Sequence, residues 1–232
     1  MTGTDPGTAA GRRRGRWLTA FLGAVIAVGL LLAGGGLAVA LGIGRTDAPA
    51  SDSVDAGFAR DMGRHHQQAV EMANLALLRS EDAEVQQLAF DISATQTNQV
   101  GRMQGWLSLW GLPRTDGEIM AWMGSDGAAE GMAHGHGAGH DTGDGAVMPG
   151  MATETELAEF RTLTGTAFDV RFLQLMIRHH QGGTEMAEYG HDHAAEPAVR
   201  RLAGSIADTQ AAETTTMATM LRERGGTSLP AP

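Results

Sequence analysis

The chain has no cysteine among its 232 residues. This absence excludes disulfide bridges, thiolate metal sites, iron–sulfur clusters, covalently attached c-type haem and cysteine nucleophiles. Lysine is also missing, because all seventeen basic residues are arginine. Nine histidines and thirteen methionines remain as the side chains with soft or borderline donor atoms.

Positive charge is scarce beyond residue 46. Residues 1–46 hold five arginines and one acid, so that 12 basic and 26 acidic residues follow, a net charge of −14 with neutral histidines. A surface of this sign disfavours nucleic acid and anionic lipid, and it concentrates cations. We therefore expect no nucleic-acid partner, although a negative surface also serves solubility.

Charge is absent from residues 17–43, which follow a polar segment, 1–16, with four arginines. A membrane span needs about 20 apolar residues, whereas the apolar part of a signal peptide has about 7 to 15. The pattern predicts a transmembrane helix, a cytoplasmic basic N-terminus and a linker at 44–53 that leads to a domain outside the membrane. The alternative is a signal peptide cleaved near Ala38-Val39-Ala40, which would release a secreted or periplasmic protein.

A sequence repeat organises the rest of the chain. The string Met62-Gly63-Arg64-His65-His66-Gln67 recurs at an offset of 114 residues as Met176-Ile177-Arg178-His179-His180-Gln181. The same offset matches Glu71-Met72-Ala73 to Glu185-Met186-Ala187, and further identities follow as far as Gly111 and Gly225. The repeat indicates an internal duplication.

Apolar positions in both copies recur at steps of three and four, which predicts helices, and no strand-like alternation competes. We expect helices at about 55–80, 81–110, 167–191 and 198–224, with a capping box at Thr153–Glu156 opening a short extra helix. Neither hairpin can bury its apolar stripe alone. The sequence therefore predicts an all-α, four-helix bundle at 54–224 and a tail at 225–232. A Gly-rich insertion at about 114–151 is predicted to be flexible.

Methionine and histidine share one helical face in each copy, so thioether and imidazole can point into one cavity. Methionines at this spacing are commonly core filler, and lone buried histidines are commonly hydrogen-bonded. Two adjacent histidine pairs facing one core need many polar partners, which favours metal ligation. The candidate metal ligands are Met62, His65, His66, Met72, Met176, His179, His180 and Met186.

The insertion offers a second group of donors, at Met132, His134, His136, His140, Met148 and Met151. Histidine-rich tracts can bind metal ions. A solvated linker without a metal is the alternative interpretation of this segment.

Several motifs resemble the family called domain of unknown function 305 (DUF305). They are the two Met-x-x-His-His and Glu-Met-Ala strings, the run Phe168–His180, the turn Met148–Met151 and the later Gln210, Glu213 and Met217. The resemblance implies a ferritin-like four-helix bundle, exported or membrane-attached, and copper binding by Met and His in some members. It implies the same eight ligands. Gly63 and Gln99 depart from the pattern, which suggests a weaker donor set in the first copy.

These observations lead us to expect a membrane-anchored extracytoplasmic protein for copper sequestration, carriage or resistance, without catalysis. Thioether favours Cu(I), and imidazole accepts Cu(I) or Cu(II). A di-iron ferritin-like oxidase is one alternative, although neither histidine pair follows Glu-x-x-His spacing. A metal-free structural or interaction module is another. The repeated strip Arg64, Gln67 and Glu71 faces away from the metal-ligand stripe, which suggests salt bridges to neighbouring helices or a surface for homo-oligomers.

Overall fold

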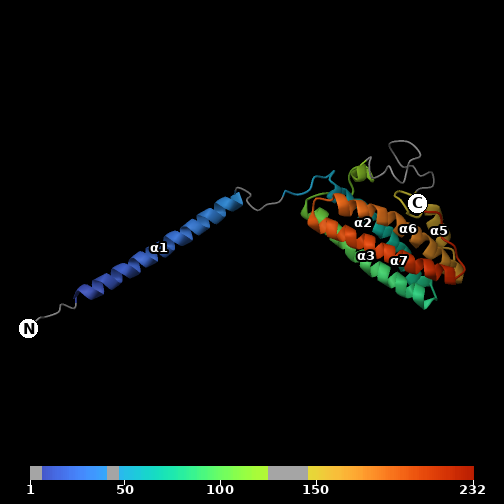
Figure 1. Ribbon diagram of the computed structural model, residues 1–232, viewed down its shortest axis with the longest axis horizontal. Helices are drawn as coiled ribbons and strands as arrows, with labels where there is room; N and C mark the ends of the chain where they lie inside the picture. Colours follow the sequence, from blue (N-terminus) through green and yellow to red (C-terminus); the bar gives the residue numbers. More distant parts are fainter. Residues whose placement is uncertain (1–6, 41–46, 125–145) are drawn as a thin grey trace, which may run out of the picture. The chain divides into compact units, whose positions relative to one another are not determined.

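The computed structural model describes residues 7–40, 47–124 and 146–232. Over these residues the chain forms six α-helices and one 3₁₀ helix, and it contains no strand (Figure 1). The predicted all-helical class is therefore confirmed. The elements are α1 (Gly7–Ala40), α2 (Val54–Arg79), α3 (Ala83–Leu109), the 3₁₀ helix η1 (Ala121–Met123), α5 (Glu154–Phe160), α6 (Gly165–His193) and α7 (Pro197–Glu223).

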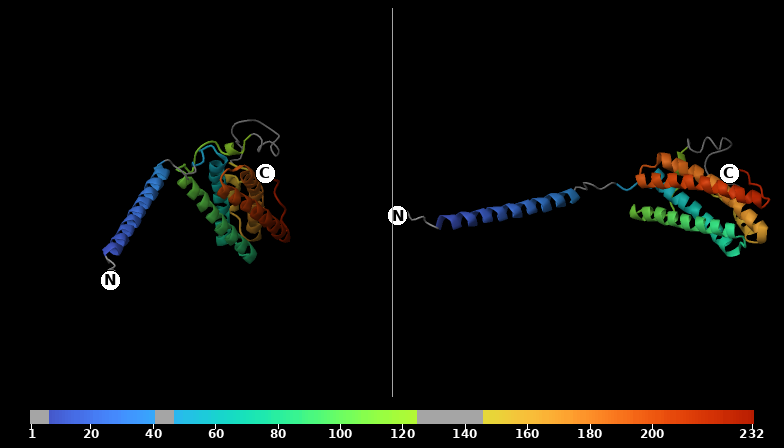
Figure 2. Two further views of the ribbon diagram at one scale, coloured as in Figure 1. Left: turned by 60° about the vertical axis from the view of Figure 1, so that its left-hand side comes forward. Right: turned by 60° about the horizontal axis from the view of Figure 1, so that its bottom comes forward.

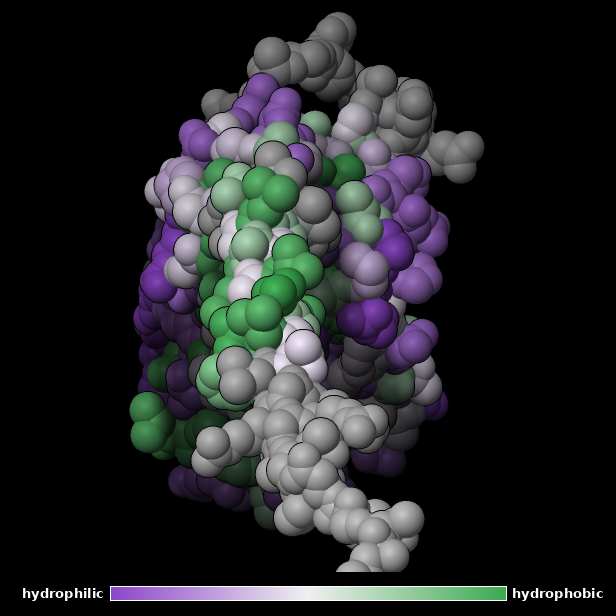
Figure 3. All heavy atoms as spheres, turned by 90° about the vertical axis from the view of Figure 1, so that its left-hand side faces the viewer, coloured by the Kyte–Doolittle hydropathy of each residue, from purple (hydrophilic) through white to green (hydrophobic). Residues whose placement is uncertain are grey.

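The chain divides into two compact units, Met1–Ala48 and Pro49–Pro232. The first contains the single helix α1, in which the 20 residues Thr19–Ala38 have a mean hydropathy of 2.2. Its large side chains are exposed, with Leu31 at 75%, and Figure 3 shows them as a continuous hydrophobic band. Length and composition suit a helix that crosses a membrane, and they equally suit a signal sequence.

Side-chain caps fix where helices of the second unit begin. Ser53 caps α2 and Asp82 caps α3, each by accepting backbone N–H groups of the first turn. Thr153 and Glu156 form the predicted capping box at the start of α5. Pro197 opens α7, where its missing N–H costs no helical hydrogen bond.

The second unit is built from two helical hairpins, α2 with α3 and α6 with α7, that meet mainly through α2 and α6 (Figures 1 and 2). Two aspartates at matching repeat positions hold the hairpins together. Asp55, at the start of α2, accepts from the backbone N–H groups of Ala195 and Glu196 in the α6–α7 turn. Asp169, near the start of α6, accepts from the Ser80 hydroxyl in the α2–α3 turn over 2.6 Å. Helices α2 and α6 therefore run antiparallel.

The interior consists of two hydrophobic clusters, and each contains one ligand-stripe methionine from either copy. One cluster includes Met72 and Met176, and the other includes Met62 and Met186. Close approach between the hairpins requires small residues. A Cβ added at Gly190 of α6 would lie 2.6 Å from the ring of Phe58 on α2. This packing leaves the four histidines between the two clusters along α2 and α6.

Candidate metal centre

The four repeated histidines occupy the middle of α2 and α6, and the side chains of all four are fully buried. The rings of His65 and His179, one from each copy, approach to 3.8 Å between centroids. Within a copy, His66 lies 6.5 Å from His65, and His180 lies 6.3 Å from His179. The fold thus brings the two predicted pairs into one interior.

Each of these histidines uses Nε2 to donate a hydrogen bond to an oxygen atom. His65 donates to the carbonyl of Pro149 over 3.1 Å, and His179 donates to the carbonyl of His65 over 3.1 Å. The remaining acceptors are Gln99 Oε1 for His66 and Glu213 Oε2 for His180, both at 2.7 Å. A carbonyl or carboxylate oxygen can only accept, so each Nε2 carries a proton. In a neutral imidazole of this tautomer, Nδ1 carries the lone pair.

All four Nδ1 atoms are buried without a hydrogen-bond partner among the described residues. An unpaired buried acceptor costs free energy, and four in one interior are unusual for a metal-free core. A histidine that donates one ring N–H to a carbonyl or carboxylate is oriented to offer its other nitrogen to a metal ion. The four Nδ1 atoms are therefore available as donors to a metal ion.

Burial keeps the rings of His65, His66 and His179 in the neutral form that binds metals. It lowers the pKa of His65 to about 4 and that of His66 to about 3. The pKa of His179 is also well below its ordinary value, because burial and the neighbouring His65 both disfavour a charge. At neutral pH these three side chains need not lose a proton before they bind a cation.

The four stripe methionines, Met62, Met72, Met176 and Met186, are at most 1% exposed. Met148 and Met151, expected in a flexible insertion, are also buried and belong to the cluster that contains Met62 and Met186. The other donors predicted in the insertion, Met132, His134, His136 and His140, lie outside the described residues. Within the described part of the chain, no three His, Asp or Glu side chains are grouped as a metal site. Thioether or amide donors would therefore have to complete the coordination of an ion.

The turn at residues 148–151 packs closely against α6. The carbonyl of Pro149 in this turn accepts the hydrogen bond that orients His65. Gly150 adopts φ +76°, and an added Cβ there would lie 2.3 Å from the carbonyl oxygen of Arg178. A Cβ at Gly182 would lie 2.2 Å from the carbonyl oxygen of Pro149. At the matching position of the first copy, Gln68 instead bonds to the backbone N–H and C=O of Ala152. One turn is therefore held by both copies through different contacts.

The two copies also differ in the partner of their second histidine. His180 donates to the carboxylate of Glu213, whereas His66 donates to the amide of Gln99 at the matching position. A carboxylate increases the basicity of the imidazole it contacts more than an amide does. The weaker donor set expected for the first copy stays a prediction.

Two buried glutamines at matching positions, Gln96 on α3 and Gln210 on α7, were not among the predicted site residues. Gln96 Oε1 and both polar atoms of the Gln210 carboxamide are buried without a partner among the described residues. The sequence contains a signal for them, since both copies have glutamine at the same position of an apolar stripe. A polar side chain that is buried there needs a polar partner.

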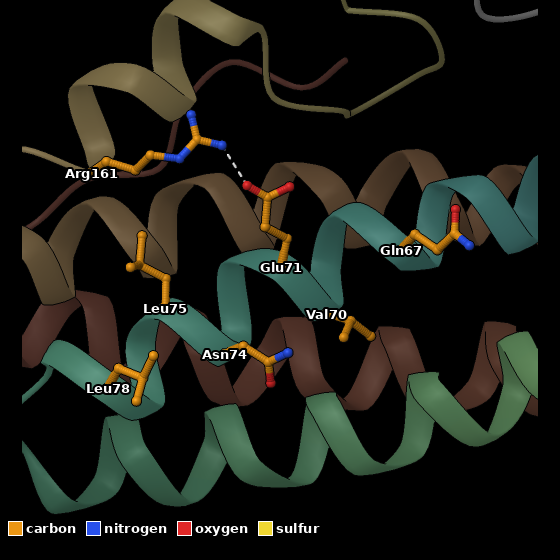
Figure 4. A pocket seen from close by; sticks show the side chains of 7 residues that line it. All are labelled: Gln67, Val70, Glu71, Asn74, Leu75, Leu78 and Arg161. Carbon is orange, nitrogen blue, oxygen red and sulfur yellow. Dashed lines mark hydrogen bonds and ion pairs between the residues drawn. The ribbon is translucent and has the colours of Figure 1, made fainter.

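One residue from each copy of the repeated outward strip forms an ion pair with the segment around α5. Arg178 forms an ion pair with Glu156 of α5, with one contact of 2.9 Å, and Glu71 pairs with Arg161. Glu71 and Arg161 also border an open hollow of about 470 Å³ on the outer side of α2 (Figure 4). The hollow is lined by Gln67, Val70, Glu71, Asn74, Leu75, Leu78 and Arg161. None of the predicted metal ligands lines it.

Comparisons with known proteins show the family and similar folds. A family model described as "Domain of unknown function (DUF305)" matches residues 55–221. A DUF305 protein from Streptomyces coelicolor, whose name describes it as secreted, is 42% identical with a TM-score of 0.67, covering 78% of this chain and 98% of that one. A DUF305 fragment from Deinococcus radiodurans is 33% identical with a TM-score of 0.57, covering 73% and 96%.

CopM, in a structure of its Cu(II)-bound form, is 26% identical with a TM-score of 0.54, covering 74% of this chain and 97% of that one. A comparison with curated proteins found no match. The family match at residues 55–221 includes all four buried histidines.

Proposed function

Because the chain belongs to the DUF305 family, we propose that it is an extracytoplasmic copper-binding protein that holds the ion between α2 and α6. The ligands are the histidine and methionine side chains of the two copies. The role is sequestration or carriage of copper, without catalysis.

One observation carries the proposal. All four histidines are buried with Nε2 donating to oxygen and with an unpartnered Nδ1. A core built only for packing would gain free energy by replacing such groups with apolar side chains. A bound cation gives a partner to each Nδ1 atom that coordinates it, and the methionines complete its coordination.

The type of donor favours copper. Soft thioether and borderline imidazole together suit Cu(I), and imidazole also suits Cu(II). The likeness to CopM in its Cu(II)-bound form supports the same choice. A di-iron centre would need several inward carboxylates, whereas Glu213 is the acidic partner that the structure places beside these histidines.

The proposal extends to fold and location. The paired hairpins suit a ferritin-like four-helix bundle, and α1 suits a membrane anchor with the second unit outside the cytoplasm. Protease added to intact spheroplasts should then digest the second unit. If the domain is protected there, or is found free in the medium, the anchored topology is wrong.

Metal analysis tests the function. The full chain, purified in detergent, should retain copper in competition with a chelator and should exclude iron and manganese. The double variant His179→Ala with His180→Ala should lose the tightest copper while remaining helical by circular dichroism. The matched control changes His191 and His193, which are exposed on the same helix, and should keep that copper. Stoichiometric iron, or no metal at all, would overturn the proposal.

A further inference from the structure

Gln210 on α7 is 2% exposed, and neither atom of its carboxamide has a hydrogen-bond partner among the described residues. The absence of a partner does not depend on which atom of the amide is oxygen and which is nitrogen, because both are unpartnered. Gln96, at the matching position of α3, is 3% exposed and has an unpartnered Oε1. A buried amide without a partner destabilises the folded state. Two such residues at one repeat position indicate a ligand rather than a packing accident.

The Gln210 carboxamide faces the same space as the imidazole of His65. A Cβ added at Gly183, one turn after His179, would lie 2.5 Å from Gln210 Oε1 and 3.0 Å from its Nε2. The same point lies 3.1 Å from Cε1 of His65, the ring carbon bonded to the unpartnered Nδ1. Because position 183 has no side chain, the Gln210 carboxamide packs against α6 beside the imidazole edge of His65.

Sulfur, nitrogen and oxygen donors favour different oxidation states of copper. Thioether and imidazole are sufficient for Cu(I) and for Ag(I), which resembles it. Cu(II) prefers a larger set of nitrogen and oxygen donors in a tetragonal arrangement. The methionines and histidines supply sulfur and nitrogen, and the buried glutamines add neutral oxygen within the same interior.

We propose that Gln210, assisted by Gln96, is the oxygen donor that allows this centre to hold Cu(II) as well as Cu(I). The inference rests on the proposed function and adds an oxidation-state selectivity to it. The second copy carries the stronger oxygen site, because Gly183 allows the Gln210 carboxamide to approach α6 closely, whereas the first copy has Ala69 at the matching position.

The test replaces Gln210 by Leu in the full chain and measures affinity for Cu(II) and for Ag(I) separately by competition. Cu(II) binding should weaken by about tenfold or more, as expected when a supporting partner of a metal is lost, while Ag(I) binding should stay unchanged. The electron paramagnetic resonance spectrum of the remaining Cu(II) should change, because an oxygen donor is gone. Gln96→Leu should show a smaller effect of the same kind. Gln87→Leu, at an exposed position of α3, is the control.

A second measurement keeps the test independent of metal loading. Without metal, Gln210→Leu should unfold at a higher temperature than the wild type, because it removes two buried unpaired polar atoms. Unchanged Cu(II) affinity and spectrum in the Gln210→Leu variant would overturn the inference. So would an equal loss of Cu(II) and Ag(I), since the residue would then support the centre without selecting. If the wild type binds neither ion, the proposed function itself fails.

Discussion

The imidazole rings of His65 and His179 lie 3.8 Å apart between centroids, with 38° between their planes, although 114 residues separate them in the chain. The contact is possible because both rings are neutral and each has a separate oxygen acceptor for its Nε2 proton. A proton on either Nδ1 would place a charge in a buried space beside another imidazole. The centre should therefore resist protonation strongly.

The first prediction follows from this resistance. Because the folded-state pKa of His65 is about 4, that of His66 about 3 and that of His179 also lowered, the unfolded chain takes up protons first as the pH falls. The stability of the metal-free protein is complete above pH about 6.5 and declines as the pH falls toward 4, by about 3 kcal/mol for His65 alone. Urea unfolding between pH 7.5 and 5 measures this decline.

Asp61 opposes the trend, since burial raises the pKa of its carboxyl and acid then favours the folded state. Glu185 acts in the same direction, because burial and the neighbouring Glu188 raise the pKa of its carboxyl. Three histidines outweigh these two carboxylates. The variant His66→Gln should have a shallower pH dependence, by at most about 1.4 kcal/mol per pH unit. Stability that is flat from pH 7 to pH 5 would contradict the neutral, buried state of these rings.

A second prediction concerns the acceptors behind the two outer histidines. Glu213→Gln should weaken copper binding by about 10- to 100-fold, because His180 loses the carboxylate that increases its basicity. Gln99→Glu should strengthen the first copy's contribution, at some cost in stability for a new buried charge. Competition titrations together with thermal unfolding separate the two effects. Equal affinities in the wild type and Glu213→Gln would show that the carboxylate has no role in binding.

The third prediction uses two glycines with nearly the same backbone conformation. Gly150 and Gly117 have φ of +76° and +75°, but only Gly150 would place a Cβ against backbone, 2.3 Å from the Arg178 oxygen. Gly117→Ala should cost roughly 1–2 kcal/mol from strain alone. Gly150→Ala should cost clearly more and should also weaken copper binding, because it displaces the carbonyl that orients His65. Urea unfolding of both variants gives the comparison, and equal costs would mean that the turn can move away freely.

A fourth prediction separates the buried centre from the histidine-containing insertion. Replacing residues 125–145 by a short neutral linker should leave the tightest copper site intact, because the flanking Trp122 and Met148 remain packed in the core. Weaker additional ions should disappear. The number of copper ions that remain bound after chelator washing, counted by mass spectrometry, distinguishes the tight site from the weaker ones. Loss of the tight site would assign it to the insertion instead.

Periodicity was enough to predict the helices and the side chains that point inward. The predicted helix at 55–80 appears as Val54–Arg79, and its Met and His residues are buried as expected. The third long helix continues to His193, beyond the expected end at His191. Histidine does not stop a helix, and the break comes only before Pro197, which begins the next one.

The acceptors behind the histidines show what sequence reasoning could not supply. Gln99 and Glu213 stand at matching positions of the repeat, so the sequence alone shows that one copy has an amide where the other has a carboxylate. Pro149 acts through a backbone carbonyl, which every residue has, so no pattern marks it. Likewise, the outward direction of Glu71 followed from periodicity, but its partner Arg161 depends on where the connection between the copies packs.

The turn at 148–151 has an evolutionary consequence. Two identical hairpins related by a twofold axis would offer two equivalent surfaces for a connecting turn, one on α2 and one on α6. A chain that joins the hairpins has only one connecting segment, so the two surfaces cannot make the same contacts. Position 182 must then stay glycine, because a side chain there would collide with Pro149. The corresponding position 68 is free to carry a glutamine that hydrogen-bonds to the backbone of Ala152. Once the duplicated halves were fused, they were no longer interchangeable. Exchanging the two halves, or splitting the chain and pairing either half with itself, should therefore not recreate the same interior.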